Sequence, residues 1–249
     1  MFSVKSSILN CILLLRGFKA LATGKLITVQ NQISMMSADD WEDFIEEWMT
    51  VKSEYYDFEK LGGAGDQGRD VIGYVTNPVR NDNYIWDNYQ CKHYSYPLRP
   101  SNIWVEIGKV CHYSYIKEYP FPRKYYFISP IGIGTKLSNL LKKPSLLKQD
   151  LYDNWENYCR SHITDTKPID LTEDFRKYIE SLDFTVFDKI PTIKIINEHS
   201  KTRFHCMRFN VPLPPKPLPL QPPPTLAHNE INYVNKLIQA YNSHCLSDI

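Results

Sequence analysis

The stretch of residues 62–92 constrains the fold of this chain more than any other. Four glycines fall within its first seven residues, and two apolar runs follow, separated by the Asn-rich segment 76–83, which also contains Pro and Asp. Asn, Pro and Asp favour turns, whereas apolar runs bounded by such residues favour strands. The pattern therefore predicts a glycine loop, a strand that begins near Arg69, a hairpin turn, and a second strand that ends near His93.

An aspartate and a Gln-x-Lys triplet fall at matching ends of these two predicted strands. Asp70 comes early in the first strand, and Gln90 and Lys92 come late in the second. Residues two apart share a face of a strand, so Gln90 and Lys92 point the same way. The sequence therefore predicts that a carboxylate, an amide and an ammonium meet across the strand pair, where together they can hold a divalent cation beside a phosphate.

The flanking segments predict an α/β fold. We expect an amphipathic helix at about 39–52, because apolar residues recur there at helical spacing, and a short strand at 55–61. A helix at 102–117 and a buried strand at 124–129 follow the hairpin. The order helix, strand, strand, strand, helix, strand predicts an α/β fold with a mixed central sheet flanked by helices and an α-rich C-terminal extension.

The sequence after residue 129 predicts mainly helices. Residues 137–160 predict two helices that are split near Pro144, and residues 172–182 predict a short helix capped by Thr172. The short apolar segments 193–196 and 202–209 are interpreted as two further strands.

A proline tract and a terminal helix end the sequence. Eight of the fourteen residues at 211–224 are proline, which predicts an extended polyproline II spacer; binding of an SH3 or WW groove stays an alternative. The following helix at 227–244 has an apolar stripe that it cannot bury alone. We expect it to dock on the body, on a second copy of the chain, on a partner protein or on a further domain. The stripe consists of Ile231, Val234, Leu237, Ile238 and Tyr241.

The N-terminal segment differs from the rest in charge. No acidic residue precedes Asp39, and the apolar run at 8–15 is too short to span a bilayer, so we predict no membrane anchor. The expected division is an N-terminal extension outside the fold at 1–36, a main domain with helical additions at 37–210, a spacer at 211–224 and a C-terminal helix at 225–249.

Composition excludes several classes of protein. With 43% apolar and 13% aromatic residues among 249, the chain can bury a sizeable core, which argues against a disordered protein. The formal net charge is +1, so nucleic acid has to bind a local patch rather than an overall basic field. The six cysteines are scattered without a CxxC pair, which argues against a zinc knuckle and favours a reducing, cytoplasmic setting.

Two segments resemble the motifs of the PD-(D/E)XK nucleases, in the branch similar to Mrr-type restriction endonucleases. They are residues 65–71, Gly-Asp-Gln-Gly-Arg-Asp-Val, and residues 90–92, Gln-Cys-Lys. Residues 90–94, 122–127 and 208–209 look similar to the N-terminal DNA endonuclease domains of bacterial anti-phage effectors, those associated with cyclic-oligonucleotide signalling and with ABC-three-component systems. The catalytic motifs cover about residues 41–128.

The resemblance implies a fold, a site and a reaction. The implied fold is restriction-endonuclease-like, and the implied reaction is metal-dependent endonucleolytic cleavage of double-stranded DNA, with Mg²⁺ as cofactor and Mn²⁺ as a substitute. The resemblance also implies that the chain is the effector of an antiviral defence system. The sequence departs from the wider pattern because Gln90 replaces a carboxylate and no proline precedes Asp70. The implied catalytic residues are Asp70, Gln90, Lys92 and Glu42; the implied metal ligands are Asp70, Gln90, Glu42 and the Cys91 carbonyl; the implied DNA contacts are Gln67, Arg69 and His93.

Several readings stay open beside this one. An ion pair for Arg69 and a core-edge position for His93 are as compatible with the sequence as DNA contacts. Asp66 is interpreted mainly as a turn former, and Glu106 with Lys109 mainly as a surface pair. The glycine loop lacks the Gly-Lys-Ser/Thr ending of a phosphate-binding loop, which excludes nucleotide hydrolysis by this element. His199, His205 and Cys206 are interpreted as structural.

Two rival functions come from other classes. The first is a catalytically inactive DNA-binding or scaffold module of a defence complex. The second is an adaptor that works through the proline tract and the last helix.

Overall fold

The computed structural model describes residues 27–63, 65–80, 82–211 and 230–245. At the centre of the described chain is a five-stranded mixed sheet of order β1-β2-β3-β4-β5. The first three strands pair antiparallel, and β4 and β5 run parallel to β3. The predicted mixed central sheet is therefore confirmed. Its strands are β1 (Asp57–Lys60), β2 (Val71–Tyr74), β3 (Trp86–Cys91), β4 (Lys124–Ile128) and β5 (Phe187–Lys189).

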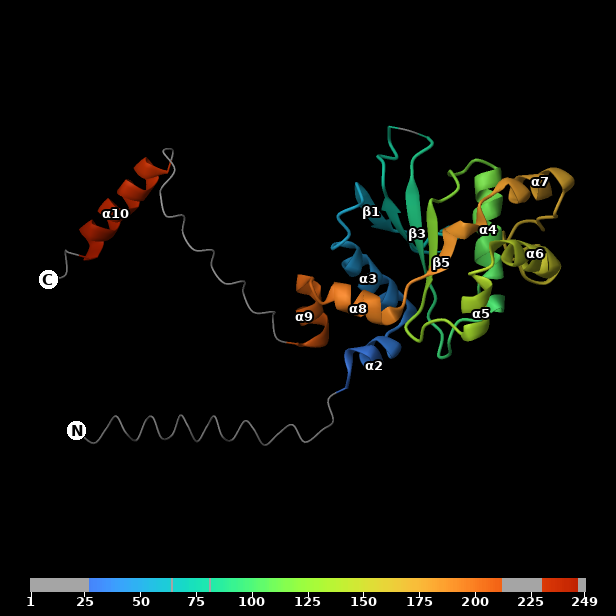
Figure 1. Cartoon of the computed structure of the whole chain (residues 1–249), viewed down its shortest axis with the longest axis horizontal. Coiled ribbons are helices and arrows are strands. Elements are labelled where there is room, and N and C mark those ends of the chain that lie inside the picture. The colour runs from blue at the N-terminus through green and yellow to red at the C-terminus, as the bar shows by residue number, and fades with distance from the viewer. Residues whose placement is uncertain (1–26, 64, 81, 212–229, 246–249) are drawn as a thin grey trace. The chain divides into compact units, whose positions relative to one another are not determined.

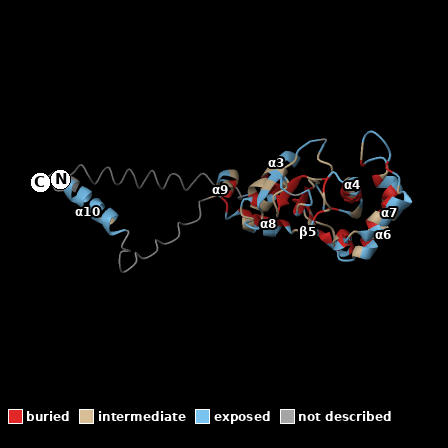
Figure 2. Ribbon diagram, turned by 90° about the horizontal axis from the view of Figure 1, so that it is seen from above, coloured by how far each residue is buried: buried red, intermediate tan, exposed pale blue. Residues whose placement is uncertain are grey.

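Helices cover both faces of this sheet (Figure 1). Seen from above, α3 and α8 lie on one side of β5, and α4, α6 and α7 lie on the other (Figure 2). One layer consists of α2 (Val29–Ser34), α3 (Ala38–Met49), α8 (Thr192–His199) and α9 (Arg203–Phe209). The other consists of α4 (Trp104–Tyr115), α5 (Thr135–Leu140), α6 (Pro144–Asn154), the π-helical turn η3 (Trp155–Cys159) and α7 (Glu173–Ser181), with 3₁₀ turns η2 (Pro100–Asn102) and η4 (Phe184–Val186).

Helix α3 forms as its sequence pattern predicts. Ser37 caps its first turn in a capping box with Asp40, which satisfies backbone N–H groups that have no partner inside the helix. Its apolar positions, spaced i, i+3, i+4 and i+7, are fully buried against the sheet. These side chains, Trp41, Phe44, Ile45 and Trp48, pack with Val71, Tyr89, Cys91 and Ile128 in one hydrophobic core.

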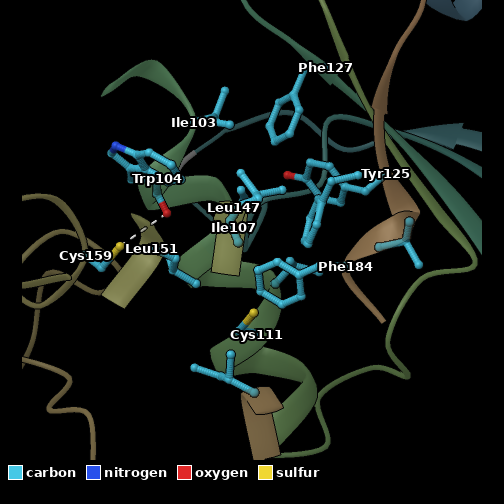
Figure 3. Close-up of a cluster of buried hydrophobic side chains, with 14 of the residues drawn as sticks. Ile103, Trp104, Ile107, Cys111, Tyr125, Phe127, Leu147, Leu151, Cys159 and Phe184 are labelled. Carbon is cyan, nitrogen blue, oxygen red and sulfur yellow. Dashed lines mark hydrogen bonds between the residues drawn. The ribbon is translucent and has the colours of Figure 1, made fainter. Parts of the chain in front are cut away.

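The second core lies between the other sheet face and helices α4–α7 (Figure 3). Helix α4 contributes Ile107 and Cys111, which pack toward Tyr125 of β4 and Leu147 of α6. Because each strand alternates its side chains between the two cores, Asn88 and Gln90 of β3 face the α4 side, whereas Tyr89 and Cys91 face α3.

Two predicted strands are wrong. Residues 193–196 and 202–209 lie in α8 and α9. The short run of Ile residues in α8 resembles a strand, but the side chains that it buries, Thr192, Ile195, Ile196 and His199, recur at helical spacing. Thr202 caps α9 by accepting a hydrogen bond from the backbone N–H of His205. The fifth strand, β5, was not predicted, because three residues carry too little periodic pattern.

The predicted extension at 1–36 reaches too far. Helix α2 belongs to the fold, since Ile33 is fully buried in the core around α3 and the Gln30 side-chain amide donates to the Pro130 carbonyl over 2.7 Å. A six-residue helix with one buried residue gives almost no signal in sequence. The apolar run at 8–15 lies outside the described residues.

The C-terminal helix forms a unit of its own. The chain divides into residues 1–213 and 214–249, and the described part of the second unit is α10 (Ile231–Cys245), as predicted for 227–244. Ile231, Leu237, Ile238 and Tyr241 of its apolar stripe are exposed. Apart from Val211, the predicted proline spacer lies outside the described residues. Among the described helices, none combines the length and apolar character that crossing a bilayer requires.

Candidate active site

Asp70 and Gln90 meet at one end of the β2–β3 pair. Antiparallel register places Val71 opposite Tyr89, so the residue before β2 lies beside the residue after Tyr89. The Gln90 side-chain nitrogen donates to Asp70 Oδ2 over 2.7 Å, and the backbone N–H of Cys91 donates to the same oxygen over 2.7 Å. Asp70 is 5% exposed and Gln90 is 2% exposed. The structure thus brings these two predicted site residues into direct contact.

The side-chain oxygen of Gln90 is directed back into the sheet. The Tyr125 hydroxyl lies 2.6 Å from Gln90 Oε1, and the Asn88 amide donates to the same atom over 3.3 Å. Both partners are fully buried. In this arrangement the side-chain nitrogen of Gln90 orients Asp70. For Gln90 to bind a metal ion through its side-chain oxygen, the amide would have to rotate.

Lys92 reaches the same region from the end of β3 and pairs with Glu106. Its ammonium lies 2.6 Å from Glu106 Oε1, and burial, which works against the charged form, is outweighed by Glu106, so that the pKa of Lys92 is raised. Lys109 is 3.6 Å both from Glu106 Oε2 and from Asp66 Oδ1. These four charged side chains form one network between the glycine loop, β3 and α4.

The prediction that Glu106 and Lys109 form a plain surface pair is wrong. Glu106 is only 4% exposed, and its Oε2 lacks a hydrogen-bond partner in the described part of the chain. A signal for this position exists in the sequence, because Glu106 lies three residues after Ile103 and four before Val110, both fully buried on α4 or at its cap. An acidic residue inside the apolar stripe of a helix marks a functional position more often than a surface one.

Charge and burial act together on Asp70. The pKa of this carboxyl is raised to about 7: burial is the main cause, Glu106 and Asp66 add to it, and Lys92 and the hydrogen bond from the Cys91 backbone oppose it. Burial also raises the pKa of the Cys91 thiol well above its ordinary value. A carboxylate that titrates near neutral pH, beside a half-buried ammonium, is typical of sites that bind cations or transfer protons.

Glu42 lies on α3, the helix that covers the opposite sheet face. Partial burial raises its pKa, Lys60 lowers it, and Asp39, Asp66 and Asp43 raise it. The charge of Asp66 in the glycine loop thus contributes to the raised pKa of Glu42, but no hydrogen bond joins Glu42 to Asp70. Within the described ranges, no three His, Cys, Asp or Glu side chains are grouped closely enough to hold a metal ion.

The three predicted DNA contacts are placed differently from one another. Arg69 donates to the side-chain oxygen of Gln67 over 2.9 Å, and its guanidinium lies 4.4 Å from the centre of the Tyr119 ring. Gln67 has a left-handed backbone, with φ of 55°, and its carbonyl accepts from the Tyr119 hydroxyl. His93 is half-buried at the end of β3, and its Nε2 has no partner among the described residues.

Asp66 shapes the glycine loop as predicted for a turn former. Its Oδ1 accepts the backbone N–H of Gly68 over 2.8 Å, a side-chain-to-backbone bond across two residues that closes the turn. Gly68 has φ of +83°, and an added Cβ would lie 3.0 Å from the Cβ of Lys109. The loop is therefore packed directly against α4, next to the charged network.

The histidines far along the chain connect helices. His199 lies 3.0 Å from Glu47 Oε2 and 2.9 Å from the Nδ1 of His205, and Arg208 contacts the same glutamate with two nitrogens. This cluster joins α3, α8 and α9, which fits the structural role predicted for His199 and His205.

No family model, no curated protein and no solved structure matches the chain.

Proposed function

We propose that the chain is a metal-dependent endonuclease that hydrolyses phosphodiester bonds in double-stranded DNA, and that it serves as a cytoplasmic effector of antiviral defence. One observation carries this proposal. Asp70 and Gln90, at the ends of two adjacent strands, are almost fully buried and hydrogen-bonded to each other, and the half-buried Lys92 that follows the second strand lies close enough to lower the pKa of Asp70. The resemblance of residues 65–71 and 90–92 to PD-(D/E)XK nucleases supports the same reading.

The residues present fit a divalent cation with few protein ligands. Asp70 and Glu106 are buried carboxylates that repel each other, and Glu106 Oε2 accepts no hydrogen bond in the described chain, although Lys109 lies 3.6 Å from it. A cation at this site would reduce the repulsion and supply Glu106 Oε2 with a close partner. Mg²⁺ keeps several waters and needs only one or two carboxylates, which agrees with the small number of acidic groups. When bound, it supplies a Lewis acid for the phosphoryl oxygens.

The chain's own residues position and stabilise the substrate. Lys92 is protonated, and its ammonium can stabilise the negative charge that builds on the phosphoryl group during attack by water. Glu106 holds Lys92 in place from α4. Gln90 and the backbone N–H of Cys91 fix the orientation of Asp70. Cleavage of both strands requires two such sites, which favours a homodimer on DNA.

Plasmid cleavage tests the proposal. Purified wild-type protein is incubated with supercoiled plasmid and Mg²⁺ or Mn²⁺, beside Asp70→Ala and Lys92→Ala. Asp165→Ala and Lys177→Ala, which change exposed residues of the same types, serve as matched controls. The proposal expects that the two controls cut and the two site variants do not. Equal cutting by all five proteins would reject the site.

One observation favours a second function, a DNA-binding module without catalysis. The Gln90 oxygen bonds to Tyr125 and Asn88, and the described residues contain no group of three acidic or histidine ligands. Such a module retards DNA in a gel but does not nick it with either metal. An adaptor that acts through residues 211–249 is distinguished by deleting them, since a nuclease keeps cutting without them.

A further inference from the structure

A cavity of about 630 Å³ lies where the loops that follow β3 and β4 meet. None of the Asp70 site residues lines it. Its two loop walls are joined by backbone hydrogen bonds, from Leu98 to the Gly132 carbonyl over 3.0 Å and from Gly134 to the Leu98 carbonyl over 2.9 Å. Ligands of open α/β sheets bind outside the carboxyl ends of parallel strands, and this volume suits a small molecule. The position and size therefore suit a binding site.

The lining of the cavity includes Trp104, at the start of α4, which is 2% exposed. Its indole nitrogen is directed away from the hydrophobic cluster (Figure 3) and is not among the fully buried atoms that lack a hydrogen-bond partner in the described chain. The N–H therefore reaches solvent, and it can donate to an acceptor of a bound ligand.

The third wall is a π-helical turn. Asn154 at the end of α6 and Tyr158 in η3 line the cavity, and the backbone N–H of Arg160 bonds to the Trp155 carbonyl, five residues back. π-Helical turns are rare and occur frequently at functional sites, because they cost helix stability. Asp150, one turn earlier on α6, adds a half-buried carboxylate to this wall.

Two positively charged side chains line the cavity. Arg99 and Lys136 are exposed there, and within the described chain neither forms an ion pair. The guanidinium of Arg99 lies 4.6 Å from the centre of the Tyr96 ring, which holds its plane in position. The lining also includes apolar residues: Pro97 is exposed, Pro100 is half-buried, and Leu98 and Leu137 are buried.

We propose that this cavity binds one nucleotide unit. The phosphate interacts with Arg99 and Lys136, a ribose hydroxyl donates to Asp150, and the base lies on the apolar floor, where Trp104 donates to one of its acceptors. Two cationic side chains, one carboxylate and an apolar lining in a single cavity match the phosphate, the ribose hydroxyls and the base of a ribonucleotide. This site is separate from the proposed hydrolysis at Asp70 and does not depend on it.

Titration calorimetry on the full chain tests the proposal. The probes are AMP, GMP, CMP and UMP, with the matching nucleosides and 2′-deoxynucleotides. The double variant Arg99→Ala/Lys136→Ala changes exposed residues and leaves the fold intact. Its matched control is Lys142→Ala/Lys143→Ala, two exposed lysines outside the cavity.

We expect at least one nucleotide to bind, with affinity reduced about tenfold or more in the Arg99/Lys136 double variant and unchanged in the control. Asp150→Asn is expected to weaken the ribonucleotide more than its 2′-deoxy form. Absence of binding by all four nucleotides at about 1 mM, equal binding by the double variant, or equal binding of nucleoside and nucleotide each overturns the proposal.

A competition experiment distinguishes a free nucleotide from one nucleotide of a nucleic-acid strand as the ligand. A short single-stranded oligonucleotide of the preferred base is added in competition with the bound mononucleotide. Displacement identifies the cavity as a site for one nucleotide of a nucleic-acid strand, and persistence of the mononucleotide identifies a free nucleotide as the ligand. Each result supports a nucleotide site, because both require the phosphate dependence measured with the double variant.

Discussion

The ammonium of Lys92 lies 2.6 Å from Oε1 of Glu106, a carboxylate that is only 4% exposed. The pair joins the end of β3 to the first turns of α4, and it places a second buried acid near Asp70. In the proposed nuclease site Gln90 stands where the resemblance leads one to expect a carboxylate, and the second negative charge near Asp70 comes from a helix rather than from the strand.

Glu106→Gln is expected to lower the pKa of Asp70. Burial is the main cause of the raised pKa of Asp70, and the charge of Glu106 adds to it, so removing that charge favours ionisation of Asp70. Carboxyl NMR of the aspartates measures this shift without reference to activity. The exposed Glu156→Gln, which also removes an acid paired with a basic residue, is the matched control. An Asp70 pKa of about 7 in both variants would contradict the coupling.

Asp70→Asn is expected to change how stability depends on pH. The unfolded carboxyl ionises near 3.8 and the folded one near 7, so between these values the folded state holds a proton that the unfolded state has released. Wild-type stability therefore falls as pH rises from about 4 to 7, and the asparagine variant lacks this loss. Between these pH values the free energy of unfolding of the variant therefore rises, relative to that of the wild type, by on the order of 4 kcal/mol.

Urea unfolding at pH 4 and pH 8, in the presence of a chelator, measures this difference. Asp165→Asn, at an exposed aspartate, is the control and is expected to follow the wild type at both values. A gap between wild type and Asp70→Asn that stays constant across the two pH values would show that burial does not oppose ionisation of Asp70.

Gln90→Glu is expected to make stability depend on a divalent cation. The Gln90 nitrogen donates to Asp70 over 2.7 Å, and a glutamate there loses the donor and sets two carboxylates side by side. We expect a loss of roughly 1–3 kcal/mol in chelator, reversed by Mg²⁺, which binds the restored carboxylate pair. Gln149→Glu makes the same exchange beside the exposed Asp153. If Mg²⁺ raises the melting temperature of both variants equally, the cation does not bind at Asp70.

Local pattern was sufficient to predict the strands that carry Asp70 and Gln90. The turn-forming segment between them and the two-residue alternation of β3 predicted that these residues meet, because neither depends on distant parts of the chain. The direction of the Gln90 amide was not predictable. It depends on Tyr125, which arrives from β4 after the whole of α4, and no local feature of residues 90–92 encodes that contact.

The burial of Glu106 was not predicted from the sequence, for a different reason. The sequence predicts a helix at 102–117, and Glu106 lies among its buried residues Ile103, Ile107 and Val110, yet a charged residue is usually on the surface. The glycine loop packs over α4 at Gly68, a contact between segments about 40 residues apart that sequence periodicity does not report.

Gly73 of β2 packs closely against the Tyr55 ring, in the sheet that supports the site. A Cβ at Gly73 would lie 2.7 Å from atoms of the Tyr55 ring, and that ring is held by its hydroxyl, which donates to Asp87 and accepts from the Tyr89 hydroxyl. Because the ring cannot move without losing these bonds, Gly73→Ala is expected to destabilise the protein by roughly 1–3 kcal/mol in urea unfolding.

Two further variants separate this clash from a general effect of alanine. Gly65→Ala has open space around its Cβ and is expected to change stability by less than about 0.5 kcal/mol. In a Tyr55→Ala background the ring is absent, so Gly73→Ala is expected to cost little, and the double-mutant cycle returns the size of the contact. An unchanged cost in that background would place the strain elsewhere in β2, since the ring that supplies the nearest atoms to the added Cβ would already have been removed.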